Sequence, residues 1–134
     1  MLVLLTGLAF ASKECLPASG QVLELAPNTY SVEKALIGEW TTDLEKAESL
    51  AYTAWHRGPD GERDGFRVRR IQCGNPLDEA GFRNGDVVHS VNGQEVTGMT
   101  DVFRVWRKVR KAEELEVTLS RKDGTKETLR YTLL

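Results

Sequence analysis

The residue types that carry covalent chemistry in proteins are few in this chain of 134 residues and are poorly spaced for catalysis. Cys15 and Cys73 do not form a Cys-x-x-Cys pair, and His56 and His89 have no ligand spacing to them, so no zinc site is predicted. The sequence also has neither a Gly-x-Ser-x-Gly nucleophile elbow nor a His-Glu-x-x-His motif. We therefore expect no enzyme activity, no metal and no cofactor.

The composition is typical of a soluble globular domain, with 40% hydrophobic and 28% charged residues. The 18 basic and 20 acidic residues give a formal net charge of -2, which does not favour nucleic acid as a partner. The length corresponds to one ordinary domain with a short extension.

The chain begins with an apolar run, Leu2–Ala11, which is too short to span a bilayer. The run ends in Ala9-Phe10-Ala11, a small-x-small pattern typical of a secretory cleavage site, but no basic residues precede it. It is either an export signal, in which case this segment is the only part expected to contact a membrane, or a buried strand. Residues 12–29, with two prolines and a glycine, are interpreted as a linker.

The elements that would position a site follow from residue 30 onward. Ser31 is expected to cap a helix over Val32–Glu39, and a second short helix is expected at Asp43–Leu50. A strand is predicted at Ala51–His56, a segment with two aromatic residues and a threonine. A second strand is predicted at Phe66–Ile71, where Phe66 and Val68 alternate with arginines.

The C-terminal half has clearer patterns. Asn75 suits the cap of a short helix that ends at Gly81, and a strand at Asp86–Val91 leads into an Asn-Gly turn. Thr100–Lys111 has the i, i+3, i+4, i+7 spacing of an amphipathic helix. Two alternating strands, around Leu115–Leu119 and Leu129–Leu133, close the chain, and the whole predicts a small α+β domain.

The segment Gly74–Gly93, GNPLDEAGFRNGDVVHSVNG, closely resembles the central signature of bacterial PDZ domains. The resemblance implies a small, partly open barrel or sandwich of five to six short strands with two helices, preceded by a helical lead-in. It divides the chain into a signal-like segment and linker (1–29) and a PDZ domain (30–134) whose core is about 50–134. It also implies a non-catalytic module that binds a protein or peptide segment by strand addition.

A narrower resemblance covers roughly residues 30–134. The lead-in helices, "DGFRVRRI" and "VFRVWRKVRKAEELEVTLSRKDG" are similar to the C-terminal PDZ domain of type II secretion system protein C. This implies a periplasmic or envelope location and partners among secretion-system components. The alternative function is a regulatory PDZ subunit or fragment associated with a bacterial protease.

By resemblance, the binding groove lies between the strand at Ala51–His56 and the helix Thr100–Lys111. We expect amides near Glu48 to receive a terminal carboxylate, Met99 and Phe103 to face the groove, and Val102 and Val109 to face the core, with Trp106 closing either one. The peptide-binding residues expected are Ser49, Leu50, Ala51, Tyr52, Thr53, Ala54, Met99, Phe103 and Trp106.

Two features modify this expectation. The Gly-Leu-Gly-Phe carboxylate loop of eukaryotic PDZ domains is absent, and Glu48 adds negative charge there, which favours internal segments or folded edges over free C-termini. The basic run Arg104, Arg107, Lys108, Arg110 and Lys111 is interpreted as a solvated helix face, the alternative being a patch for an acidic partner.

The leading segment generates one prediction. If Leu2–Ala11 is an export signal, cleavage after Ala11 should give a mature chain that begins near Ser12. N-terminal sequencing of the protein from its native host checks this, and an intact Met1 in a cytosolic fraction would refute it.

Overall fold

The computed structural model describes residues 15–134, so the segment Leu2–Ala11 and its predicted role in export lie outside the described residues. The described chain forms eight strands and four helices, with these bounds: β1 (Val22–Ala26), β2 (Thr29–Val32), α2 (Lys34–Thr42), α3 (Leu44–Glu48), β3 (Tyr52–Arg57), β4 (Arg63–Arg69), α4 (Pro76–Glu79), β5 (Val87–Val91), β6 (Gln94–Glu95), α5 (Met99–Val109), β7 (Glu114–Ser120) and β8 (Lys126–Leu133).

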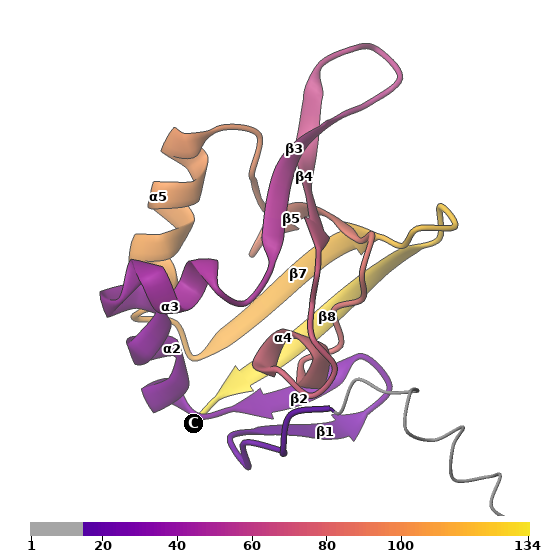
Figure 1. The fold of residues 1–134 in the computed structure, drawn as a ribbon. Helices are drawn as coiled ribbons and strands as arrows, with labels where there is room; N and C mark the ends of the chain where they lie inside the picture. The colour runs from indigo at the N-terminus through magenta and orange to yellow at the C-terminus, as the bar shows by residue number, and fades with distance from the viewer. Residues whose placement is uncertain (1–14) are drawn as a thin grey trace, which may run out of the picture.

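The strands form one sheet in the order β1-β2-β8-β7-β5-β4-β3, with β6 paired to β5 beside this path. All neighbours are antiparallel except β2 and β8, which run parallel. Helices α2, α3 and α5 lie together on one side of the sheet, and the β3–β4 hairpin projects beyond it (Figure 1). The predicted α+β fold is confirmed, and β1 and β2 are additional strands that place β1 and β3 at the two ends of the sheet.

The core lies where β7 and β8 cross the middle of the sheet. Leu119 and Leu129 have exposed fractions of 1% and 0%. Tyr131 stacks on Tyr30 and Phe82, with ring centroids 5.5 and 6.5 Å away. The Tyr131 hydroxyl donates a hydrogen bond of 2.5 Å to a backbone carbonyl of α4's C-terminal end, and burial raises the pKa of this phenol above its ordinary value.

The predicted cap of α4 is confirmed and also fixes the start of β3. The Asn75 side-chain oxygen accepts hydrogen bonds from the amides of Leu77 and Asp78, at 2.9 and 3.0 Å. The side-chain nitrogen of Asn75 donates to the carbonyl of Leu50 at 2.9 Å. One buried amide group therefore holds the helix and the segment that leads into β3 together.

The interpretation of the N-terminal part was wrong in two places. Residues 22–26, assigned to a linker, form β1, and the helix predicted from Val32 begins two residues later as α2, because Ser31 and Val32 belong to β2. Val32 pairs with Leu133 and Tyr30 with Tyr131. The partner strand is the last one in the chain, so no local pattern could have indicated this pairing.

A buried arginine ties the β7–β8 hairpin to the β4–β5 connection. Arg121 is 7% exposed and donates to Asp86 at 2.7 Å, to the Gly81 carbonyl at 3.0 Å, and to Glu127. Burial alone lowers the pKa of Arg121, but the bond to Glu127 and the charge of Asp86 raise it above its ordinary value. The bond from Arg121 in turn lowers the pKa of Glu127. Arg121 is therefore a permanently charged crosslink.

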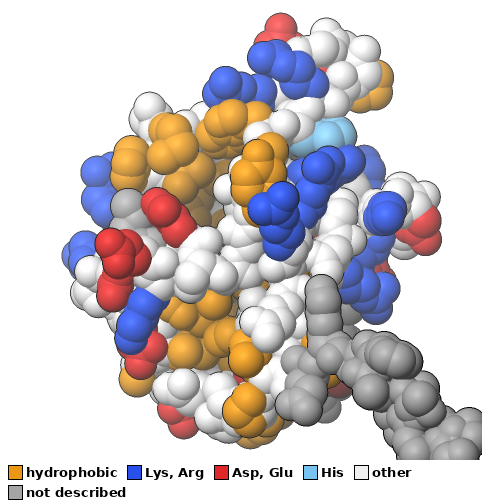
Figure 2. Space-filling model, viewed as in Figure 1, with side chains coloured by type: hydrophobic (Ala, Val, Ile, Leu, Met, Phe, Trp, Pro, Cys, Tyr) orange, Lys and Arg blue, Asp and Glu red, His pale blue; other side chains and the backbone are white. Residues whose placement is uncertain are grey.

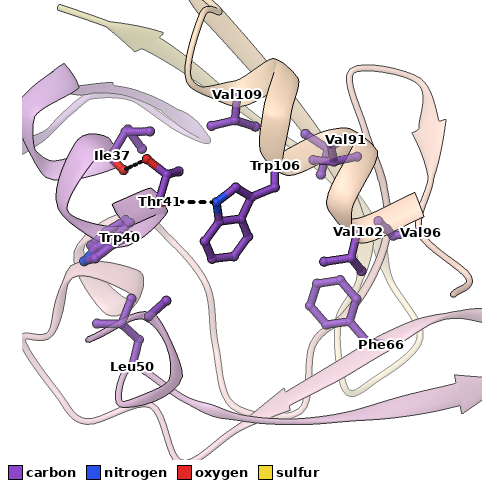
Figure 3. Close-up of a pocket in the computed structure, with 12 residues that line it drawn as sticks. Ile37, Trp40, Thr41, Leu50, Phe66, Val91, Val96, Val102, Trp106 and Val109 are labelled. Atoms are coloured by element: carbon purple, nitrogen blue, oxygen red, sulfur yellow. Dashed lines mark hydrogen bonds between the residues drawn. The ribbon is translucent and has the colours of Figure 1, made fainter. Parts of the chain in front are cut away.

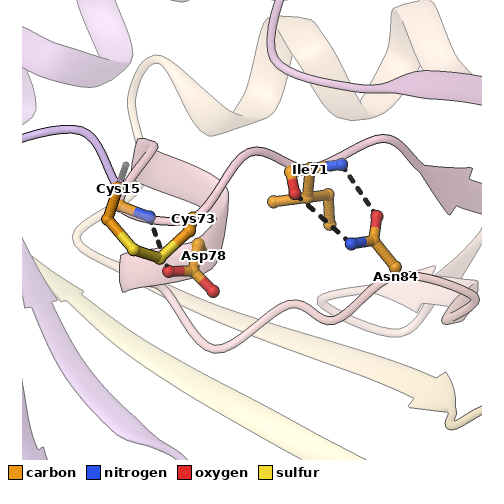
Figure 4. The surroundings of a disulfide bond; sticks show 6 residues. Cys15, Ile71, Cys73, Asp78 and Asn84 are labelled. Carbon is orange, nitrogen blue, oxygen red and sulfur yellow. Dashed lines mark hydrogen bonds between the residues drawn. A yellow bond between two sulfur atoms is a disulfide. The ribbon is translucent and has the colours of Figure 1, made fainter. Parts of the chain in front are cut away.

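From its loop position in the sequence, Cys73 is expected to be a free, partly buried thiol, and this expectation is wrong. Cys73 forms a disulfide with Cys15, with a Cα–Cα distance of 4.6 Å (Figure 4). Beside it, the amide of Leu16 donates to the Cys73 carbonyl at 2.8 Å. Gly74 has a positive φ of 85°, and a Cβ there would lie 2.3 Å from the Leu16 carbonyl oxygen. The glycine lets the N-terminal segment lie directly against the loop before α4.

The disulfide closes a long loop, with a sequence separation of 58. Its removal should lower the free energy of unfolding by about 2–4 kcal/mol, because the unfolded chain gains conformational freedom. Urea unfolding of Cys73→Ser and of the oxidised wild type measures this difference. Wild type treated with reductant should match the double variant Cys15→Ser/Cys73→Ser; equal stability of oxidised and reduced wild type would contradict the assignment.

Candidate functional site

Strand β3 has a sheet neighbour on one side only. Within residues 15–134, its paired strand is β4, and β3 ends the sheet. A sheet end exposes backbone N–H and C=O groups that can pair with another chain. The predicted groove strand is therefore an edge strand in the fold.

Hydrogen bonds further inside the sheet identify which β3 residues carry the free groups. The Val68 amide donates to Asp86 and the Val68 carbonyl accepts from Gly85, at 2.9 and 2.8 Å. Both Val68 groups thus point toward β5, so its register partner Thr53 directs both of its own groups outward. By alternation, Trp55 does the same, while Tyr52 and Ala54 bond to β4.

The side chains of Thr53 and Trp55 lie on the sheet face that α5 covers. Trp55 packs edge-to-face on Phe66 of β4, with ring centroids 6.5 Å apart. Phe66 in turn lines an apolar cavity of about 280 Å³ between the sheet and the helices. The free edge and the cavity are therefore neighbours.

The cavity is open on one side and is lined by three parts of the chain (Figure 3). Its lining residues come from α2, α3 and the turn after it (Ile37, Trp40, Thr41, Ala47, Leu50), from the sheet side (Phe66, Val91, Val96) and from α5 (Val102, Val105, Trp106, Val109). None comes from β1, the strand at the other end of the sheet. The cavity thus distinguishes the β3 edge from the β1 edge.

Helix α5 turns its apolar face toward this cavity without burying it completely. None of its residues is fully buried. Val102 and Val109, expected in the core, are half-buried in the cavity wall, although Val102 also packs against the core. Trp106, left open between groove and core, projects into the cavity in Figure 3, and its indole N–H donates to the Thr41 carbonyl at 3.2 Å. Trp106 therefore joins α5 to the lead-in helix α2.

Met99 and Phe103 do not line the cavity. Their exposed fractions are 54% and 57%, high for such large apolar side chains. Their spacing to Trp106 (i, i+4, i+7) places all three along one side of α5. Their contact with a partner stays a prediction, and the structure leaves both side chains free to make it.

The loop before β3 is less suited to a carboxylate than we expected. The Ser49 amide donates to the Glu45 carbonyl at 3.0 Å, and the Leu50 amide donates to the Ala47 carbonyl at 3.3 Å. Both amides therefore end helix α3, because the last turn of a helix takes up the N–H groups that follow it. Two of the amides expected to receive a free C-terminus are already engaged.

The remaining residues predicted to bind a partner lie in β3 or directly before it and differ in exposure. Ala51 is half-buried, and Tyr52, Thr53 and Ala54 are exposed. Sequence reasoning missed the contribution of Ile37, Trp40 and Phe66 to the cavity wall. Ile37 lay in a predicted helix and Phe66 in a predicted strand, but only their packing brings them to one cavity.

Among residues 15–134, no group of His, Cys, Asp and Glu side chains comes together as metal ligands would. In the same range, no helix has both the length and the apolar character needed to cross a bilayer.

An edge strand beside an apolar groove under one helix defines a small domain of the PDZ type. The model of the PDZ domain family matches residues 41–133, and the chain belongs to that family.

Among curated proteins, the chain is 33% identical over 127 residues to a probable periplasmic serine endoprotease DegP-like of Rhizobium meliloti (strain 1021). The match covers 92% of this chain but 23% of that protein, so the chain spans about a quarter of its relative.

Two solved structures share the fold. The PDZ domain of EpsC from Vibrio cholerae has a TM-score of 0.52 and 17% identity, over 73% of this chain and 91% of that one. The PDZ domain of the pullulanase C protein of the type II secretion system from Klebsiella pneumoniae, solved in complex with fatty acid, has a TM-score of 0.51 and 13% identity, over 73% and 99%. The resemblance to PDZ domains of type II secretion proteins is thus confirmed at the level of the fold.

The exposure of Phe103 generates a prediction about the division between folding and binding. Phe103→Ala should weaken binding of a segment selected on the wild-type protein by about 1–3 kcal/mol, since an aromatic contact is lost. It should change the free energy of unfolding by less than about 1 kcal/mol, because the side chain is already 57% exposed. Titration calorimetry and urea unfolding measure the two quantities.

The matched control is Leu129→Ala, at a side chain with an exposed fraction of 0%. It should lower stability by about 2–5 kcal/mol through a cavity in the core, with binding unchanged among folded molecules. Unfolding by Phe103→Ala would instead place Phe103 among the core residues.

Proposed function

We propose that this chain is a non-catalytic module that binds an extended segment of a partner protein as an added strand along β3. The single observation that carries the proposal is the free edge of β3, where Thr53 and Trp55 direct their backbone groups outward beside an apolar cavity. A segment that paired there would gain main-chain hydrogen bonds from β3 and apolar contacts from α5.

The surroundings of the edge support this function. Among the described residues, seven large hydrophobic side chains are exposed; Tyr52, Met99 and Phe103 belong to β3 or α5, and Leu23 and Leu25 belong to β1. Hydrophobic side chains gather between the β3–β4 hairpin and α5 on the face that Figure 2 shows. Exposed apolar surface of this kind marks an interaction site more often than scattered residues do.

An envelope location is part of the proposal. The disulfide between Cys15 and Cys73 supports it, because disulfides persist in oxidising compartments and are rare in the cytosol. The sequence similarity to a periplasmic protein and the fold shared with type II secretion PDZ domains agree with it. We propose secretion-system components as the partner class.

A second candidate function is the regulation of a protease. The observation that favours it is the 33% identity to a DegP-like endoprotease over nearly the whole chain. The two functions differ in their genetic context. Secretion genes beside this gene in its native genome would favour the first function, and a protease gene would favour the second.

Strand addition is tested by a substitution that removes one outward donor and leaves the β3–β4 ladder intact. Thr53→Pro should keep the fold, because proline is tolerated on an edge where the missing N–H faces outward. It should weaken binding of a segment selected on the wild-type protein by about tenfold or more, since one main-chain hydrogen bond is lost and the ring blocks the approach. Titration calorimetry measures the affinity, and circular dichroism follows the fold.

Two variants serve as controls. Thr53→Val keeps the backbone donor and the side-chain shape, so affinity should change little. Ala54→Pro removes an amide that bonds to β4 and should lower thermal stability where Thr53→Pro does not. Binding unaffected by Thr53→Pro would show that the partner does not pair with this edge.

A further inference from the structure

The charges of the chain are unevenly placed around the β3 edge. The net charge is -2, yet the β3–β4 hairpin and the residue after it carry Arg57, Arg63, Arg67, Arg69 and Arg70. The acidic residues of this hairpin, Asp60, Glu62 and Asp64, lie in its connecting loop and at the start of β4, so Arg67, Arg69 and Arg70 follow one another without an acidic residue between them. Figure 2 shows basic side chains over the β3–β4 hairpin and beside the hydrophobic groove.

Three of these arginines lie on the sheet face opposite the cavity. Arg69 and Arg67 are the register partners of Tyr52 and Ala54, so the four side chains point to the same face. The guanidinium of Arg70 lies 5.3 Å from the ring centroid of Tyr52, which brings it to the edge strand itself. Ala54, with only a methyl group, leaves the space above β3 open to the longer side chains.

These arginines lack carboxylate partners of their own. Among residues 15–134, Arg67, Arg69 and Arg70 form no ion pair, whereas Arg104, Arg121 and Arg130 each do. The Nε atom of Arg67 is buried without a hydrogen-bond partner in the same range. A buried donor without an acceptor costs free energy, which an incoming acceptor would recover.

A strand added along β3 would present its side chains to both faces in turn. Those beside Thr53 and Trp55 would face the apolar cavity and α5, and those beside Tyr52 and Ala54 would face the arginines. The engaged amides of Ser49 and Leu50, together with the acidic α3, offer little to a free carboxylate.

We infer that the segment bound at β3 is an internal one in which apolar residues alternate with Asp or Glu. The inference rests on the proposed function and adds the chemistry of the partner. The apolar residues fill the cavity side, and the carboxylates pair with Arg69 and Arg70 on the other face. A guanidinium and a carboxylate make strong, geometrically specific pairs, so the arginines would select sequence as well as add affinity.

The experiment selects binding segments from two libraries of random twelve-residue sequences. In the loop library each segment is joined to a carrier protein at both ends, and in the second library each segment ends in a free C-terminus. On the wild type, the loop library should enrich segments with acidic residues at alternate positions. The best segment is then synthesised with blocked ends, alongside a copy in which each Asp or Glu is replaced by its amide. The amide copy should bind about tenfold more weakly at low salt, and the difference should shrink as salt screens the charges.

Two charge-reversal variants make the test local. Arg69→Glu/Arg70→Glu should abolish the preference for the acidic segment over its amide copy. Arg107→Glu/Lys108→Glu changes the net charge by the same amount on exposed positions of α5 and should preserve that preference. If both variants respond alike, the effect is one of net charge, and the inference is wrong.

The remaining outcomes separate this inference from the proposed function. Segments that bind in a manner sensitive to Thr53→Pro but show no acidic preference would overturn the inference and leave strand addition intact. Enrichment of free C-termini alone would overturn the internal mode. Failure of both libraries to yield any segment sensitive to Thr53→Pro would count against the proposed function itself.

Discussion

The buried contact between Arg121 and Asp86 sets the geometry on which the site depends. Asp86 has an exposed fraction of 0%, and its carboxylate accepts from Arg121 and from the Arg83 amide, both at 2.7 Å. Removing one partner of such a pair would leave a charge buried without compensation. The contact therefore holds the turn before β5 in one conformation.

That turn decides how β3 can be used. Gly85 and Asp86 take up both backbone groups of Val68, which forces the hydrogen bonds between β4 and β3 into one alternation. In that alternation Tyr52 and Ala54 face β4, and Thr53 faces outward. If the pairing of β3 with β4 shifted by one residue, the side chains of β3 would change faces as well. The aromatic side chain of Trp55 would then lie among the arginines. A contact in the protein interior thus fixes which atoms the edge offers.

The helical lead-in has a second constraining role. Trp106 of α5 donates to α2, and Ile37 and Trp40 of α2 form one wall of the cavity. The lead-in therefore supports α5 beside β3 without filling the space between them. The apolar face of α5 stays half-covered, and burial of more apolar surface by a partner would gain roughly 25 cal/mol for each Å² removed from water.

The sequence by itself determined the parts of the fold whose causes are local. The turns between Gly74 and Gly93, the cap at Asn75, the amphipathic α5 and the alternating β7 and β8 follow from glycine, asparagine and hydrophobic spacing. From the order of strands in the family that the signature resembles, the sequence also predicted β3 as the groove strand; the structure shows β3 at the edge of the sheet, and its contact with a partner stays a prediction.

Only the tertiary structure decided the rest, because the causes join residues far apart in the chain. Strand β2 pairs with β8, the last strand of the chain, and the disulfide forms because the fold brings Cys15 and Cys73 close together. The cavity wall combines α2, β4 and α5, and the engaged amides of Ser49 and Leu50 depend on where α3 ends. A sequence pattern records what each segment prefers, whereas the groove depends on distances between segments, which packing alone sets.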